Sequence, residues 1–117
     1  MNYEWRFSDD KPIYPQIVEQ MERLIVSGEL LPGDKLPSVR DLAREAQVNP
    51  NTMMRALSEL ENRELIISHR VNGKSVTEDT KLIKKVKDEL AKNVIKDFLD
   101  GMMQLGYTKE EILELLW

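Results

Sequence analysis

Apolar residues recur at helical spacing in three segments of the first 62 residues, with turn-forming residues between them. The first predicted helix runs from Pro12 or Ile13 to Ser27 and stops at Gly28, a residue common just after helix ends. Its apolar side holds Tyr14, Ile17, Met21, Leu24 and Ile25. This side is expected to face a core.

Two shorter helices, joined by a polar turn, are predicted next. Ser38 caps the first of them, and Asp41 lies three residues later, near the positive end of the helix dipole. Asn49 caps the second, where Pro50 takes the first helical position. The inward-facing positions are Leu42, Ala43, Ala46, Met53, Ala56, Leu57 and Leu60. The outer side of the second helix is therefore polar at its start, which is typical of a helix that enters a DNA major groove.

A β-hairpin follows these helices. Residues 65–68 and 75–77 read as strands, and residues 69–74 form a loop with Asn72 and Gly73 at its tip. Upstream, Lys35 and Leu36 follow a Pro-Gly turn and form a minimal strand. Residues 1–7 alternate aromatic and polar side chains, which fits either a short edge strand or an extended arm.

The composition changes at Glu78, where a helical tail begins. Asp79 or Thr80 caps a long helix that Gly106 ends, and Thr108 with Glu111 forms a capping box for a last short helix. The long helix carries an apolar stripe of Leu82, Val86, Leu90, Val94, Phe98 and Met102. The predicted fold is mainly α with a small β-hairpin: a winged helix-turn-helix domain at 1–77 and a two-helix tail at 78–117.

Charge and composition narrow the function. The net charge is −4, yet seven basic and five acidic residues between Lys35 and Val76 give this stretch +2 and leave −6 for the remainder. Local charge at a binding face matters more than the total. With no cysteine, one histidine and no glycine-rich phosphate loop, we expect no enzyme, no metal site and no cofactor. No apolar run is long enough to span a membrane and no signal-peptide pattern is present, so a cytoplasmic location is expected.

Four motifs carry a resemblance to a known family. They are PIYPQI at 12–17, SGELLPGDKLPSVRDLA at 27–43, VNPNT at 48–52 and ALSELENRELI at 56–66. Together they resemble the GntR family of bacterial transcription regulators, and the VNPNT form and short tail resemble its YtrA subfamily. The resemblance implies a dimeric winged-helix repressor that binds a palindromic operator in double-stranded DNA. The aminotransferase-like extension of one branch is absent, so pyridoxal phosphate is not implied.

The resemblance also implies which residues bind DNA. They come from the start of each of the two short helices and from the wing: Ser38, Arg40, Asn49, Asn51, Thr52, Met54, Arg55, His69, Arg70 and Gly73. Two departures concern the wing. Glu64 stands where the family usually has glycine, and Val71, Gly73 and Ser75 occupy the places of its glycine-x-glycine-x-aromatic motif.

Each of these residues has a simpler interpretation. Arg40 has Asp41 and Glu45 as candidate ion-pair partners, while Asn51 and Thr52 are candidate caps for free backbone N–H groups. An exposed helix arginine such as Arg55 is usually just solvated. The lysines at 81, 84 and 85 either extend the DNA surface or form part of a solvated face.

The stripe from Leu82 to Met102 either folds back on the first domain or forms a dimer interface. A symmetric homodimer is expected, because a 77-residue body offers little surface to cover the stripe. The tail is too short for a separate effector domain, so any small-molecule effector is expected at the dimer interface. The alternative function is a winged-helix protein-interaction module without DNA binding. Steep salt dependence would distinguish DNA binding from this alternative.

Overall fold

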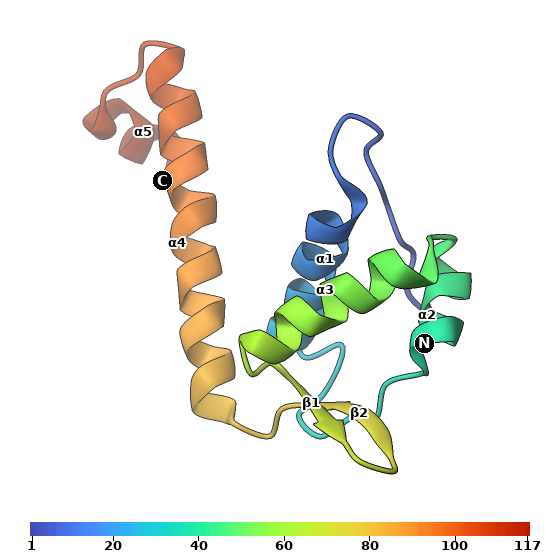
Figure 1. The fold of residues 1–117 in the computed structure, drawn as a ribbon. Coiled ribbons are helices and arrows are strands. Elements are labelled where there is room, and N and C mark those ends of the chain that lie inside the picture. Colours follow the sequence, from blue (N-terminus) through green and yellow to red (C-terminus); the bar gives the residue numbers. More distant parts are fainter. The chain divides into compact units, whose positions relative to one another are not determined.

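The computed structural model describes residues 1–117, which form two compact units, Met1–Lys84 and Lys85–Trp117 (Figure 1). In chain order the elements are α1 (Ile13–Ser27), α2 (Val39–Ala46), α3 (Pro50–Asn62), β1 (Ile66–His69), β2 (Gly73–Val76), α4 (Thr80–Gln104) and α5 (Lys109–Leu116). The predicted mainly α fold with one small hairpin is confirmed. None of the helices has the length and hydrophobicity needed to cross a membrane.

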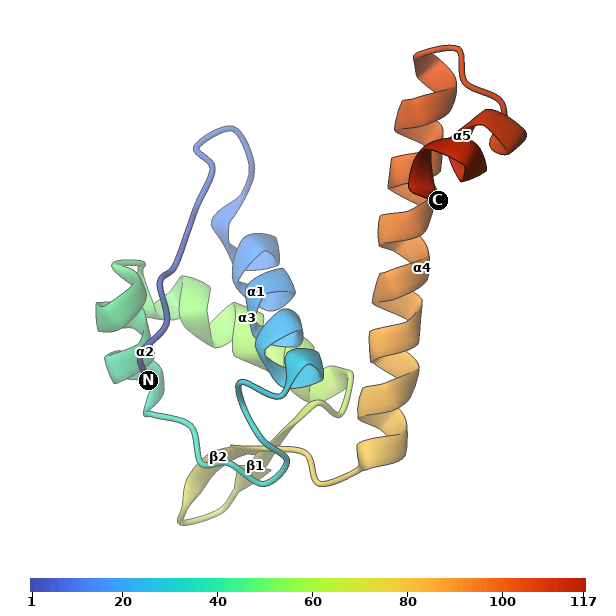
Figure 2. The ribbon, with the colours of Figure 1, turned by 180° about the vertical axis from the view of Figure 1, so that it is seen from behind.

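The core of the first unit is built around α3. This helix packs against α1, α2 and β1, and α1 crosses it in both views (Figures 1 and 2). The predicted inner positions of α3 are all fully buried: Met53, Ala56, Leu57 and Leu60. On α1, which packs against α3, Ile17, Met21 and Ile25 are at most 1% exposed. Burial of one side of α3 leaves its opposite side at the surface.

Side-chain caps begin the helices where the sequence predicted them. The Ser38 Oγ accepts the Asp41 N–H at 3.1 Å, and the Asn49 Oδ1 accepts the Asn51 N–H at 2.8 Å. The Asp79 Oδ1 accepts the Leu82 N–H, which selects Asp79 over Thr80 as the cap of α4. The capping box of Thr108 and Glu111 at α5 is also present. Each cap satisfies a backbone donor that the helix leaves free.

Two non-glycine residues take the left-handed backbone conformation at helix ends. Gln47, with φ of 57°, ends α2, and Glu64, with φ of 64°, follows α3. At the second turn the Leu65 N–H donates to the Leu60 carbonyl at 3.0 Å. The turn at Glu64 therefore has the geometry that glycine favours, although a glutamate occupies it.

The wing is an antiparallel hairpin with a third short segment beside it. Ile66 pairs with Val76, and His69 pairs with Gly73. The prediction of a loop over 69–74 with Asn72-Gly73 at its tip was therefore wrong in detail, because the loop contains only residues 70–72. Gly73, with φ of 78°, closes this three-residue loop from within β2. The predicted minimal strand is a single bridge between Lys35 and Ser75.

Residues 1–7 form an extended arm, not an edge strand. The arm runs from beside α2 to the start of α1 (Figure 1), where two glutamines one turn apart bind its backbone. The Gln20 side chain accepts the Arg6 N–H at 3.1 Å and donates to the Arg6 carbonyl at 2.8 Å. Gln16 makes the same pair of bonds to Ser8, at 2.7 and 3.0 Å. These side-chain amides bond the backbone N–H and C=O groups that a neighbouring strand would bond in a sheet.

A buried carboxylate joins α1 to the end of α3. Glu22 is 8% exposed, and its Oε1 accepts a hydrogen bond from the Arg63 Nη1 at 2.6 Å. Burial raises the pKa of the Glu22 carboxyl, and the neighbouring Arg63 guanidinium only partly opposes this rise. Arg63 also bonds Glu59 at 3.1 Å, so one guanidinium holds both helices together.

The second unit consists of most of α4 together with α5. No residue of the 25-residue α4 is buried, whereas Ile112 of α5 is 1% exposed. The two helices line an open apolar groove of about 690 Å³. Its walls are Val94, Ile95, Phe98, Leu99, Ile112, Leu113 and Leu116, with Lys109 at the edge.

Replacement of Glu64 by glycine is expected to stabilise the protein. Glycine removes the cost of a left-handed side-chain-bearing residue but adds chain entropy to the unfolded state, for a net gain of about 0.5–1 kcal/mol. Urea unfolding monitored by circular dichroism measures this difference. Glu19→Gly, at an exposed position inside α1, is the matched control and should cost about 1 kcal/mol. A loss of stability in Glu64→Gly would contradict the left-handed turn.

Candidate nucleic-acid interface

The residues predicted to bind DNA come from the N-terminal ends of α2 and α3 and from the wing, and all of them except the half-buried Thr52 are exposed. We call this set the reading surface; it comprises Ser38, Arg40, Asn49, Asn51, Thr52, Met54, Arg55, His69, Arg70 and Gly73. The start of α2 and the wing lie together, because Ser38 lines one crevice with Asn72 and Gly73. The other end of α2 leads through the Gln47 turn into α3.

The first two turns of α3 present side chains with unused hydrogen-bonding groups. Asn49 and Asn51 are exposed, Thr52 is half-buried, and Met54 is 46% exposed. Asn49 serves as the cap, as predicted, but only its Oδ1 is engaged, so its amide NH₂ has no protein partner. The side chains of Asn51 and Thr52 make no capping hydrogen bond. The interpretation of Asn51 and Thr52 as helix caps is therefore not supported.

Arg55 is exposed, but its guanidinium contacts the face of an aromatic ring. Its Cζ lies 3.9 Å from the centre of the Tyr14 ring, which comes from the first turn of α1. Arg55 forms no hydrogen bond or ion pair with the protein. The carboxylate one turn further along α3, Glu59, is bonded to Arg63 instead.

Arg40 has no protein partner either. Its two candidate partners are both engaged elsewhere: Asp41 bonds Arg44 at 3.3 Å, and Glu45 bonds the Met1 amino group at 3.1 Å. The interpretation of Arg40 as one half of a helix ion pair is therefore not supported. An unneutralised cation in the first turn of a helix attracts an anion together with the free N–H groups there.

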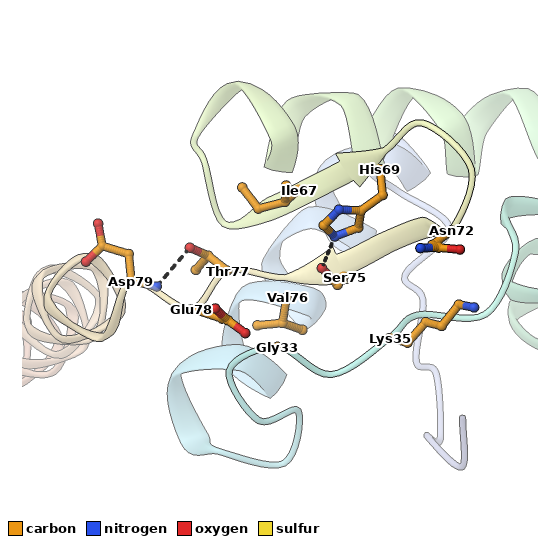
Figure 3. A pocket seen from close by; sticks show the side chains of 10 residues that line it. All are labelled: Gly33, Lys35, Ile67, His69, Asn72, Ser75, Val76, Thr77, Glu78 and Asp79. Atoms are coloured by element: carbon orange, nitrogen blue, oxygen red, sulfur yellow. Dashed lines mark hydrogen bonds between the residues drawn. The ribbon is translucent and has the colours of Figure 1, made fainter.

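The wing carries polar groups around an open cavity of about 550 Å³ (Figure 3). The His69 Nε2 lies 2.6 Å from the Ser75 Oγ across the two strands, so this histidine is bonded within the wing. Lys35 and Asn72 line the same cavity, and Figure 3 shows both side chains on the side of the loop. Arg70, in the loop itself, is exposed. The wing thus offers Lys35 and Arg70 as cations.

Lys74 is not available to a ligand, because it is bonded to α3. Its ammonium group bonds the Glu61 carboxylate and lies 2.7 Å from the Ser68 Oγ, which also donates to Glu61. Burial raises the pKa of Glu61, but the hydrogen bonds from Lys74 and Ser68 outweigh it and leave the pKa below its ordinary range. This cluster attaches both wing strands to the helix that carries Arg55.

Sequence reasoning missed the residues that act across elements. Tyr14 was assigned only to the apolar side of α1, Glu61 was counted only as an acidic residue, and Lys74 only as a basic one. The partners are 41 residues apart for Tyr14 and Arg55 and 13 apart for Glu61 and Lys74. No local periodicity reports such pairs. The predicted hairpin placed Lys74 in its loop, whereas the structure pairs Lys74 with Ser68 across the two strands.

A helix-turn-helix followed by a two-stranded wing, with an unneutralised polar surface at the helix starts, defines a winged-helix DNA-binding protein. Residues 13–76 match the model of the bacterial regulatory proteins of the gntR family. The chain belongs to this GntR family. It is a DNA-binding transcriptional regulator, and the family is one of regulators, not enzymes.

Two Bacillus subtilis proteins are similar in sequence to this chain. One, an uncharacterized HTH-type transcriptional regulator YhcF, is 44% identical over 109 residues, which cover 93% of this chain and 90% of that protein. The other, the HTH-type transcriptional repressor YtrA, is 47% identical over 70 residues, or 60% of this chain and 54% of that protein. The expected YtrA-like character is confirmed.

Solved structures extend the comparison to three dimensions. A GntR family transcriptional regulator from Listeria monocytogenes is 44% identical, with a TM-score of 0.88 over 94% of this chain and 96% of that one. The DNA-binding domain of AraR in complex with operator ORX1 has 26% identity and a TM-score of 0.55. The match covers 65% of this chain and 93% of that one. A structural neighbour of this domain has thus been solved on DNA.

Replacement of Glu61 by glutamine should lower the free energy of unfolding by about 1 kcal/mol at neutral pH, because the charge-assisted bonds to Lys74 and Ser68 are lost. The folded-state pKa of Glu61 is lowered, so its contribution is present above the unfolded value of about 4.3 and is lost as pH falls through the folded value. Urea titrations at several pH values should show the two proteins converging in acid. A constant difference between them would contradict this assignment.

Proposed function

We propose that this chain acts as a homodimeric repressor that binds an inverted-repeat operator through the reading surface. The observation that carries the proposal is the set of unneutralised polar groups at the starts of α2 and α3, above all Arg40 and Arg55. Arg44 of α2 and Arg63, just after α3, are bonded to carboxylates, whereas Arg40 and Arg55 are not. An exposed cation without a counter-ion is available to a phosphate or a base edge.

In this proposal the reading surface divides into positioning and reading groups. Asn51, Thr52, Met54 and Arg55 enter the major groove, where an arginine can donate two hydrogen bonds to guanine. Arg40 and the capped starts of α2 and α3 bind phosphates. His69, Arg70 and Gly73 bring the wing to the neighbouring backbone. For Lys81, Lys84 and Lys85 both interpretations, an extension of the DNA surface and part of a solvated face, stay predictions.

The exposed apolar stripe of α4 supports the homodimer. We place the boundary between the DNA-binding domain and the dimerisation tail at residues 77–78. A helix of 25 residues with no buried side chain has an apolar stripe left to cover. Val94 is 60% exposed and Phe98 43% exposed, and both line the groove between α4 and α5. A second copy would cover the proposed interface, which comprises Leu82, Val86, Leu90, Val94, Phe98 and Met102.

Symmetry relates such a dimer to its DNA. A two-fold axis presents two identical reading surfaces in opposite directions, so the operator should be an inverted repeat with half-sites about one helical turn, ~34 Å, apart. Repression is supported by the similarity to YtrA, a protein named as a repressor. An effector would act at the dimer interface by binding one arrangement of the two reading units better than the other.

The first test is footprinting on DNA upstream of the protein's own gene, at two salt concentrations. A protected inverted repeat, with an affinity that falls by about 0.9 log unit per phosphate contact for each tenfold rise in salt, is expected. Arg40→Ala should weaken binding and reduce this slope by about one contact. Arg23→Ala removes the same charge from an exposed position on α1, outside the reading surface, and serves as the control. Equal losses in both variants would contradict the assignment of Arg40.

Replacement of Phe98 by aspartate should separate the dimer without unfolding the chain. A charge at this half-exposed stripe position is tolerated in a monomer but costs several kcal/mol in a dry interface. Sedimentation at micromolar concentration should give a dimer for the parent and a monomer for Phe98→Asp. Lys92→Asp places the same side chain at an exposed position on the side of α4 opposite Leu90 and Val94, and it should leave the dimer intact. Monomeric parent protein would remove the dimer from the proposal.

A further inference from the structure

The stacked pair of Tyr14 and Arg55 joins the core of the first unit to its reading surface. Tyr14 is the second residue of α1 and is half-buried, whereas Arg55 lies in the second turn of α3 and is exposed. The Arg55 Cζ lies over the Tyr14 ring, 3.9 Å from its centre, which is well within cation–π contact distance. Because α1 packs against α3, the ring is held in place by the core itself.

Arg55 also lacks a hydrogen-bond acceptor within the protein. A guanidinium has five N–H donors, all lying in its plane, and stacking covers its face but not its edges. No protein acceptor bonds to any of these donors. The carboxylate that a helix arginine would normally bond, one turn away at Glu59, is held by Arg63, which also binds the buried Glu22. The guanidinium of Arg55 is therefore held against the Tyr14 ring, while its N–H donors have no protein acceptor.

These facts matter because an arginine must be ordered before it can read a base. A free arginine side chain samples many rotamers, and binding must restrict them at a cost in affinity. Recognition of guanine requires two parallel N–H bonds in one plane, so the orientation of the guanidinium plane decides whether both can form. A ring that fixes this plane in the free protein removes part of that cost.

We propose that Tyr14 is a positioning residue for DNA recognition: its ring holds the Arg55 guanidinium in the plane from which its edge donates to a guanine. The proposal rests on the proposed function, because it requires Arg55 to contact the operator. It assigns to a residue of α1, outside the helix-turn-helix and the wing, a role in base selectivity. Tyr14 itself makes no DNA contact in this scheme.

A double-mutant cycle on operator affinity tests the proposal. Arg55→Ala should weaken binding roughly ten- to a hundredfold, as for the loss of one good base contact. Tyr14→Leu should weaken it roughly three- to tenfold, and the double variant should bind as Arg55→Ala does. Tyr14→Phe keeps the ring and should stay within about twofold of the parent. The conservative variant also shows that the ring, and not the hydroxyl group, is what matters.

Measurements of base selectivity distinguish a positioning role of Tyr14 from a merely structural one. Against a set of single-base operator variants, Tyr14→Leu should relax the preference at the same base pair as Arg55→Ala and at no other. In the free protein, the Arg55 side-chain protons should show a ring-current shift in the NMR spectrum that Tyr14→Phe retains and Tyr14→Leu loses. This second measurement does not depend on DNA or on the stability of any complex.

The outcomes distinguish the two proposals. If Arg55→Ala binds the operator like the parent, both the assignment of Arg55 to DNA and the role of Tyr14 are overturned. If Arg55→Ala is weakened but Tyr14→Leu reduces affinity equally in the parent and in the Arg55→Ala background, only the role of Tyr14 falls. Absence of the ring-current shift, or tighter binding by Tyr14→Leu, would also overturn the role of Tyr14.

Discussion

The complete burial of one side of α3 is the constraint on which the rest of the first unit depends. Met53, Ala56, Leu57 and Leu60 have no solvent contact, so this helix cannot rotate about its axis without exposing them. The opposite side is therefore presented at a fixed angle. The same packing brings the first turn of α1 against the second turn of α3, and it places the end of α3 where β1 must begin. The packing of the core therefore fixes the orientation of the reading surface.

Ion pairing resolves the conflict between an acidic chain and an anionic partner. The acidic residues of α2 and α3 each have a specific partner within the fold: Asp41 has Arg44, Glu45 has the Met1 amino group, Glu59 has Arg63, and Glu61 has Lys74. These carboxylates are neutralised locally and repel DNA less than the net charge of −4 implies. Arg40 and Arg55 remain without counter-ions. The arrangement concentrates positive potential where the helices start.

Local features of the chain predicted most of the fold. Helical spacing and capping residues located α1, α2 and α3, and the Asp79 and Thr108 caps located α4 and α5, because these signals act within one or two turns. The shape of the wing loop depended on where the strands stop pairing, which is decided between strands. Glu64 shows the same limit, since the fold imposes a left-handed turn there against the preference of the residue.

The site could be predicted only as a set of exposed positions, because its geometry comes from contacts between elements. The sequence indicated that Arg55 faces outward, but it held no sign that Tyr14 would cover one side of it. The engagement of Lys74 was equally hidden, so a count of basic residues overstates the cations that the wing can offer. Residues that lack a partner were recognisable only after all the other pairs had been assigned.

The way the N-terminal arm is bound affects which of its residues can be substituted during evolution. Gln20 binds the backbone of the arm at Arg6, and Gln16 binds the backbone of the adjoining Ser8, so these bonds do not depend on the side chains at those two positions. Substitutions there can accumulate without displacing the arm, whereas a change at either glutamine affects the whole segment at once. Two residues of α1 thus hold the end of this segment through its backbone, whatever side chains stand at positions 6 and 8.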